Sequence, residues 1–222
     1  TIGELISSYG TFVRNVNDNG LTIAGGNASN SGANVTVYGG SHGSYPDTVR
    51  FRIDGSEKAR IDGSGRLLLG TTTEGEASAD DLTIAGSGNQ GITIRSGTSN
   101  YGLIYFSDAT SGTGEYDGAI EYKHSDNFMV FRTGASERLR IDSSGRLLHG
   151  HDTSRTVGDR THLIQIEGTA LQDGGLSMVR NRNDEHSTSI TLAKTRGSST
   201  GANTIVQSGD SIGEFAFAAG DG

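Results

Sequence analysis

The twenty residues 51–70 read FRIDGSEKARIDGSGRLLLG, and residues 131–150 repeat this sequence with small changes as FRTGASERLRIDSSGRLLHG. At this offset of 80 positions, 13 of the 20 residues are identical. Each copy holds Arg-Ile-Asp, a short stretch rich in Gly and Ser, and Arg-Leu-Leu. This order predicts a β-hairpin, because glycine readily adopts the positive φ that a tight turn requires. The repeated hairpin therefore indicates a β-structured chain built from modules.

A second phrase divides the chain into repeats. LTIAG occurs at residues 21–25 and 82–86, and the looser LIQIEG at residues 163–168. Because the first two repeats differ in length, modules strung along an axis are favoured over a solenoid, whose coils need a nearly fixed period. The expected domains are an N-terminal segment at 1–20, repeat 1 at 21–81, repeat 2 at 82–162, and an incomplete repeat 3 at 163–222. The N-terminal segment is a candidate attachment end.

The composition excludes several classes of protein. The chain has 222 residues, of which 35 are Gly, one is Pro and none is Cys or Trp. Without Cys there is no disulfide or thiolate metal site. The net charge of -8 argues against a nucleic-acid partner, which requires a basic surface. No apolar run approaches the 18 residues of a membrane span, so no membrane insertion is expected.

Short segments rich in β-branched and aromatic residues recur between clusters of Gly, Ser, Asn and Asp, which predicts an all-β fold. In one of them Val49, Phe51 and Ile53 alternate with polar residues and so share one face of a strand. A weak helical pattern is confined to residues 1–16. The eight expected strand segments are 34–40, 48–54, 91–97, 102–108, 118–124, 127–133, 188–194 and 203–209.

These strands are too thinly apolar to build a large core from one chain. Only 32% of the residues are hydrophobic, and short strands leave open edges that invite further pairing. Identical chains around a shared axis would supply apolar partners and cover the edges. We therefore expect an elongated, repeat-built fibre, an intertwined homotrimeric β-prism or β-sandwich shaft. A self-contained monomeric sandwich is the alternative.

The repeats also resemble a known family. SERLRIDSSGRLL at 136–148, with DATSGTGEYDGAIEYKHSDNFMVF at 108–131, is similar to repeat modules of bacteriophage tail fibres, especially those of phages that infect marine cyanobacteria. The resemblance is good over 82–150, moderate over 48–73 and loose over 163–222. It implies a homotrimeric virion shaft that joins other tail proteins and attaches to a host-surface glycan or protein. A cellular surface adhesin or an extracellular filament subunit remains the alternative, and a polysaccharide-degrading tailspike a third.

No catalytic residue is expected. A glycan-cleaving site would use a pair of carboxylates, but an acidic cluster occurs only in the second repeat, without a Trp platform. A solvated acidic loop that keeps an acidic fibre soluble is the favoured explanation. Ser-Glu recurs at 56–57 and 136–137 without an accompanying His, so no serine triad is repeated. The acidic cluster consists of Asp108, Glu115, Asp117, Glu121 and Asp126.

Two further groups of side chains leave alternatives open. His149 and His151 would point the same way if they share a strand, and three chains could then bring six imidazoles together around a transition metal. Otherwise they are surface histidines, and no cofactor is needed. Four tyrosines of repeat 2 are a sugar-stacking surface or ordinary cross-strand pairs. These are Tyr101, Tyr105, Tyr116 and Tyr122.

Overall fold

The computed structural model describes residues 17–28 and 30–219, and within them the regular structure is β apart from one short 3-10 turn, η1 (Gly112–Glu115). This confirms the all-β fold class. The weak helical pattern at 1–16 lies outside the described residues, as does most of the expected N-terminal segment. The chain divides into two units, unit 1 at Thr1–Thr93 and unit 2 at Ile94–Gly222.

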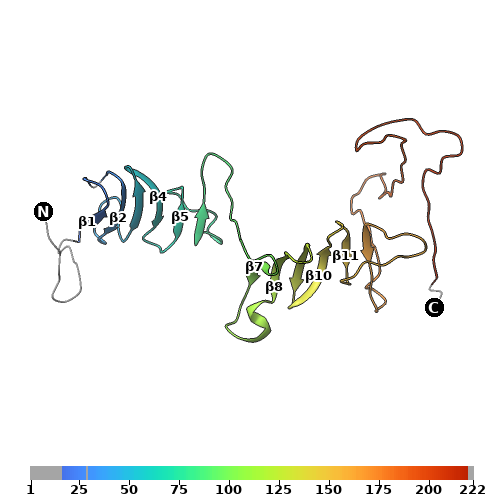
Figure 1. Cartoon of the computed structure of the whole chain (residues 1–222), viewed down its shortest axis with the longest axis horizontal. Coiled ribbons are helices and arrows are strands. Elements are labelled where there is room, and N and C mark those ends of the chain that lie inside the picture. Colours follow the sequence, from blue (N-terminus) through green and yellow to red (C-terminus); the bar gives the residue numbers. More distant parts are fainter. Residues whose placement is uncertain (1–16, 29, 220–222) are drawn as a thin grey trace. The chain divides into compact units, whose positions relative to one another are not determined.

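Each unit holds one six-stranded sheet whose strands follow one another in chain order (Figure 1). Neighbouring strands are antiparallel, except that the last strand of each sheet is parallel to the one before it. The first sheet contains β1 (Gly20–Ala24), β2 (Ala33–Tyr38), β3 (Val49–Ile53), β4 (Ser56–Ile61), β5 (Leu67–Leu69) and β6 (Leu82–Ile84). The second contains β7 (Tyr101–Phe106), β8 (Gly118–Lys123), β9 (Phe128–Thr133), β10 (Ser136–Ile141), β11 (Leu147–His149) and β12 (Ile164–Ile166).

The repeated phrase forms the expected hairpins, β4–β5 and β10–β11. In the first turn Asp62 Oδ1 accepts hydrogen bonds from the backbone N–H groups of Ser64 (2.9 Å) and Arg66 (3.1 Å). Asp142 makes the same two bonds in the second turn. The glycine of each turn has positive φ, 85° at Gly65 and 77° at Gly145. A local sequence with its own hydrogen bonds thus sets the turn, and it does so twice.

The phrase that opens each sequence repeat lies at the end of a sheet. Leu82–Ile84 forms β6, parallel to β5, and Ile164–Ile166 forms β12, parallel to β11. Gly70 and Gly150 follow β5 and β11 with φ of 73° and 82° and turn the chain away from each hairpin. Strands β6 and β12 therefore belong to the sheet of the preceding residues. The expected repeats 2 and 3, in contrast, begin at residues 82 and 163 and include these strands.

Three of the eight expected strands are not formed, namely 91–97, 188–194 and 203–209. The prediction of strands there is wrong for the single chain. A strand needs a partner strand for its backbone hydrogen bonds, and among the described residues none of these three segments forms a β-ladder, although the Arg196 N–H donates one bond to the Thr204 carbonyl. Residues 91–96 have no backbone hydrogen bond to any part of the chain that the structure describes. Alternation of residue type alone does not supply a partner.

Candidate assembly surface

One face of the unit 1 sheet is built from apolar residues on all six strands. The pairing register places two unbroken rows across the sheet, each with one residue from every strand. We call this surface the apolar face. Its first row is Ile23, Val35, Phe51, Ala59, Leu69 and Ile84, and its second row is Leu21, Val37, Val49, Ile61, Leu67 and Leu82.

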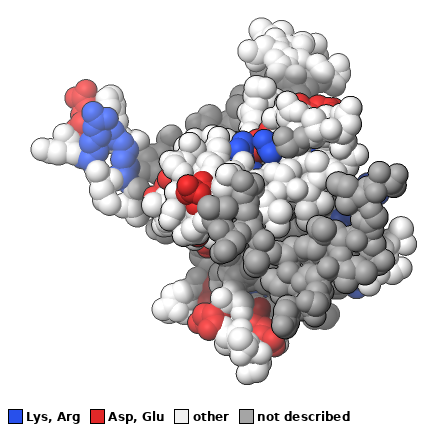
Figure 2. Space-filling view, turned by 90° about the vertical axis from the view of Figure 1, so that its left-hand side faces the viewer, with Lys and Arg blue, Asp and Glu red and all other residues white. Residues whose placement is uncertain are grey.

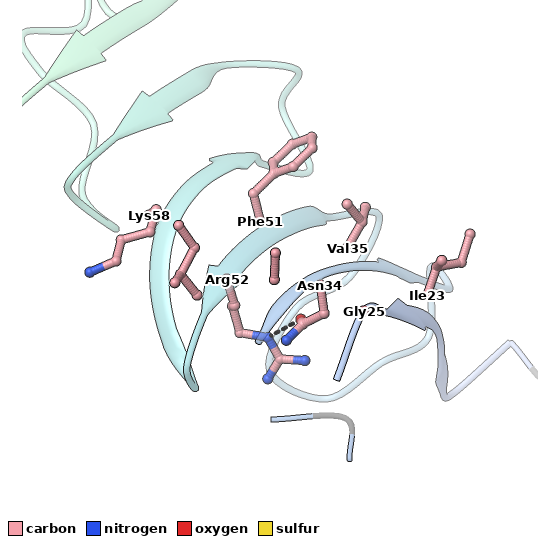
Figure 3. Close-up of a pocket in the computed structure, with 9 residues that line it drawn as sticks. Ile23, Gly25, Asn34, Val35, Phe51, Arg52 and Lys58 are labelled. Carbon is pink, nitrogen blue, oxygen red and sulfur yellow. Dashed lines mark hydrogen bonds between the residues drawn. The ribbon is translucent and has the colours of Figure 1, made fainter. Parts of the chain in front are cut away.

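This apolar face is exposed in the single chain. Ile23 retains 74% of its accessible surface, Ile53 51% and Phe51 39%. In Figure 3, Ile23, Val35 and Phe51 project from one side of the sheet, and Asn34 and Arg52 project from the other. A hollow of about 430 Å³ lies beside strands β1, β2 and β3, and its lining includes Ile23, Val35, Phe51, Asn34 and Arg52. A water-soluble monomer rarely leaves such a surface uncovered.

The opposite face of the same sheet holds the buried residues, and many of them are polar. Asn34, Thr36 and Thr48 are at most 4% exposed, beside Leu68 at 1%. Arg52 donates hydrogen bonds to Asn34 Oδ1 and Thr36 Oγ1, both at 3.0 Å. We call this side of each sheet the arginine face. The usual polarity of a half-exposed sheet, with apolar residues inside and polar residues in water, is therefore reversed.

Ion pairs and hydrogen bonds within the chain bind the arginines of the arginine face of unit 1. Glu57 accepts hydrogen bonds from both Arg50 and Arg60, and the Arg50 guanidinium lies 4.0 Å from the centre of the Tyr45 ring. Such stacking on an aromatic ring is favourable for a cation. Because the arginines of this face are already bonded within the chain, two of them to the shared Glu57 and Arg52 to neutral side chains, the face needs no second chain to complete it.

Unit 2 repeats the same division. Its buried residues Ala119, Glu121, Val130 and Leu148 lie on its arginine face. There Arg140 donates two 2.7 Å hydrogen bonds to Glu137 and lies 4.1 Å from the centre of the Phe128 ring. The apolar row on its other face is Ile104, Ile120, Phe131, Leu139, His149 and Ile166.

Acid is expected to weaken the fold through its paired carboxylates. Burial alone would raise the pKa of Glu57, but hydrogen bonds from Arg60 and Arg50 outweigh it and lower that pKa below 4.5. Asp62 and Asp142 are likewise lowered below 3.8, because hydrogen bonds from the turn and its arginine outweigh burial. A depressed folded pKa stabilises the fold above the unfolded pKa, and the contribution is lost as pH falls through the folded pKa.

The midpoint of thermal unfolding should therefore stay nearly level from pH 7 to about pH 5 and drop below about pH 4.5. Glu57→Gln, which keeps the shape but cannot titrate, should lower the midpoint at pH 7 and reduce the drop between pH 7 and pH 3.5. Circular dichroism at fixed protein concentration measures both. An equal drop in the variant and the parent protein would show that Glu57 does not contribute to the acid response.

The two histidines of the sequence prediction are placed differently. His149 ends β11 and lies on the apolar face, between Leu139 and Ile166. Gly150 then turns the chain with φ of 82°, so His151 is outside the strand. The His151 side chain is 10% exposed, with Nδ1 2.9 Å from the carbonyl of Thr153. Within residues 17–28 and 30–219 no cluster of three His, Cys, Asp or Glu could hold a metal. The interchain metal site stays a prediction.

The acidic residues of repeat 2 are distributed over different elements. Glu121 lies on the arginine face, with Oε1 2.9 Å from Arg132 Nε, and Asp126 pairs with Lys123 at 2.9 Å in the β8–β9 turn. Asp108, Glu115 and Asp117 lie on the β7–β8 connection. Each of the first two carboxylates is thus neutralised by its own cation.

The four tyrosines divide three to one. Tyr101 and Tyr105 lie on the arginine face of β7, and the ring centres of Tyr105 and Tyr116 are 6.3 Å apart. Tyr122 lies on the other face, where its hydroxyl donates a 3.1 Å hydrogen bond to Asn127 Oδ1. Strand alternation places Tyr101 and Tyr105 together, but the approach of Tyr116 depends on the path of the connection and could not be read from spacing.

On the surface drawn in Figure 2, Lys and Arg side chains form small groups, and some of these groups lie beside acidic side chains. Among the described residues there is no helix long and apolar enough to cross a membrane.

No protein-family model matches the chain, and a search of curated proteins finds no match.

Proposed function

We propose that this chain is a structural subunit of a phage tail fibre, which assembles as a homotrimer through the apolar faces of its two sheets. The trimeric shaft belongs to the virion, docks on other tail proteins and carries the fibre to the host surface. It is not an enzyme. The observation that carries the proposal is the reversed polarity of both sheets, which leaves rows of apolar residues uncovered on each unit.

Copies of the same chain are the partners that this surface fits best. Apolar burial drives association in proportion to the area removed from water. A closed ring of identical chains covers every apolar face without leaving a new one exposed, whereas an open arrangement would continue to grow. In such a ring the arginine faces, whose arginines already have hydrogen-bond or ion-pair partners within the chain, lie toward solvent. Each chain thus contributes the same face to a shared core.

The three unpaired segments support an intertwined form of this assembly. Ile92 is 70% exposed and Ile190 59% exposed, and both occupy alternating sequences of the kind found in strands. Strands that lack a partner in their own chain can pair with the free edge of a neighbour, as edge strands readily do. The same segments would then become ordered sheet only when chains associate.

The assignment to a phage fibre, within this structural class, rests on the resemblance of residues 108–131 and 136–148 to fibre repeats. A cellular adhesin or extracellular filament subunit would use the same apolar faces and remains the alternative. In both cases the chain works by geometry and multivalency: several weak contacts on one assembly bind together more tightly than any one of them alone.

Light scattering on the purified chain tests the assembly. We expect one species with three times the chain mass of 23.1 kDa, unchanged on dilution through the micromolar range and in dilute denaturant. Circular dichroism recorded in parallel checks that the chain is folded. A folded species of 23.1 kDa would overturn the proposal, and so would a broad, concentration-dependent mass distribution, because that indicates nonspecific aggregation of the apolar faces.

A further inference from the structure

An exposed aromatic group lies at the edge of unit 2, on the arginine face and hence opposite the apolar face. Strand β7 contributes Tyr101 (38% exposed), Leu103 (37%) and Tyr105 (47%) to this side, and Tyr116 (39%) approaches from the β7–β8 connection. We call these four residues the tyrosine platform. We propose that it is a carbohydrate-binding site that takes neutral hexopyranose units of a surface glycan. This inference rests on the proposed fibre function, because it assigns the attachment step to a place on the chain.

The sheet itself does not require these rings. In unit 1 the corresponding edge strand is β1, which is also first in its sheet. On its arginine face β1 carries Gly20, Thr22 and Ala24. A sheet of the same topology thus forms with small residues at the positions where unit 2 exposes aromatic rings. The platform is an addition to unit 2, and solvent-exposed aromatic surface of this kind is typical of binding sites.

The geometry of the two central rings suits a pyranose. The Tyr105 and Tyr116 rings are inclined by 47°, with their centres 6.3 Å apart. Ring faces of this kind pack against the apolar C–H face of a sugar. The Tyr105 and Tyr116 hydroxyls have no hydrogen-bond partner among the described residues, so both can donate to and accept from sugar hydroxyls. An apolar face bordered by free hydroxyls matches a ligand of the same mixed character.

The charges around the platform favour an uncharged sugar. The connection that carries Tyr116 also carries Asp108, Glu115 and Asp117, and residues 107–117 include no Lys or Arg. Beside Tyr101, Lys123 Nζ lies 5.3 Å from the ring centre but is paired with Asp126. A polyanion such as a polyuronate or a nucleic acid would therefore meet net negative charge here.

In the proposed trimer the platform stays accessible and occurs three times. The apolar faces turn toward the shared core, so the arginine faces carry the platforms outward. A shallow site with a few stacking contacts binds one sugar weakly, but three sites on one shaft engage a repeating glycan together. Weak binding at each platform and strong binding by all three together suit attachment to a glycan that presents many identical sugar units.

The test uses the full chain in its assembled form. Immobilised dextran, mannan and galactan serve as neutral probes, with a polyuronate as the acidic probe, and biolayer interferometry measures binding. We expect the protein to bind at least one neutral polymer and not the polyuronate. Tyr105→Ser and Tyr116→Ser should each weaken binding about tenfold, because each removes a stacking ring at the centre of the site. Tyr105→Phe, which keeps the ring, is the matched control and should stay within about threefold.

Light scattering on every variant separates the two proposals. A variant that keeps the parent mass but loses binding supports the platform. A parent protein that is not a trimer contradicts the proposed assembly, whatever it binds. A trimer that binds none of the neutral polymers, that binds only the polyuronate, or whose Ser variants bind as the parent does overturns the carbohydrate site and leaves the fibre proposal standing.

Discussion

Phe51→Glu is expected to convert the assembled protein into single folded chains. Phe51 lies in the middle of an apolar row, paired across the sheet with Val35 and Ala59, and is 39% exposed. In a single chain the new carboxylate points into water, so the sheet of unit 1 can still form. In the trimer the same substitution places three carboxylates in an apolar core, where an unpaired charge costs several kcal/mol or shifts to its neutral form.

Light scattering at micromolar concentration should therefore show the mass fall from three times 23.1 kDa to one chain, with an unchanged β signal in circular dichroism. Ser64→Glu is the control, because it adds the same charge in the β4–β5 turn, away from the apolar face, and should remain trimeric. If Phe51→Glu also remains trimeric, the apolar face of unit 1 is not the contact between chains.

Gly150→Ala is expected to destabilise unit 2 more than substitution of any other turn glycine in the repeated phrase. Gly150 has φ of 82°, a conformation that costs an Ala roughly 1–2 kcal/mol. In addition, its Cβ would lie 2.1 Å from the carbonyl oxygen of Glu167, which is backbone and cannot swing away. Relieving that contact requires β12 to move from β11, and overpacking of this kind costs about a further 1–3 kcal/mol.

The hairpin glycine Gly145 supplies the matched control. Its φ of 77° is similar, but a Cβ there would meet nothing within 4 Å. Gly145→Ala thus measures the conformational cost alone, and the difference between the two unfolding midpoints, at equal protein concentration, measures the close approach. Gly70 and Gly65 form the same pair in unit 1, where the Gly70 Cβ would lie 2.3 Å from Ala85 O. Equal losses for Gly150→Ala and Gly145→Ala would show that β12 does not depend on the close contact.

Much of the fold could be predicted because its signals are local. The hairpin turn depends on residues 62–66 and again on residues 142–146. In each, the Asp side chain accepts hydrogen bonds from backbone N–H groups two and four positions later. The alternation of Val49, Phe51 and Ile53 likewise indicated a two-faced strand. The expected strands at 91–97, 188–194 and 203–209 failed for the complementary reason: their alternation is local, but the strand partner that pairing requires is not.

The candidate surface was visible in the sequence only as a set of residues. The tyrosines of repeat 2 could be counted, yet only the structure separates Tyr122 from Tyr105 and Tyr116. A metal site on the two histidines requires that they share a strand, and the positive φ of Gly150 ends that strand between them. A single glycine in a left-handed conformation changes the direction of the chain, and spacing does not reveal it.

By itself the sequence determined the β class, the repeated hairpin and the positions of its turns, because each depends on residues within a few positions of one another. Only the tertiary structure decided that β6 and β12 form the last strand of their sheets, each parallel to the strand before it and joined to it by a connection of more than ten residues. It also decided that the arginine face is the buried one and the apolar face the exposed one. Both outcomes depend on packing between strands distant in sequence, where burial and pairing are settled together and no local pattern specifies them.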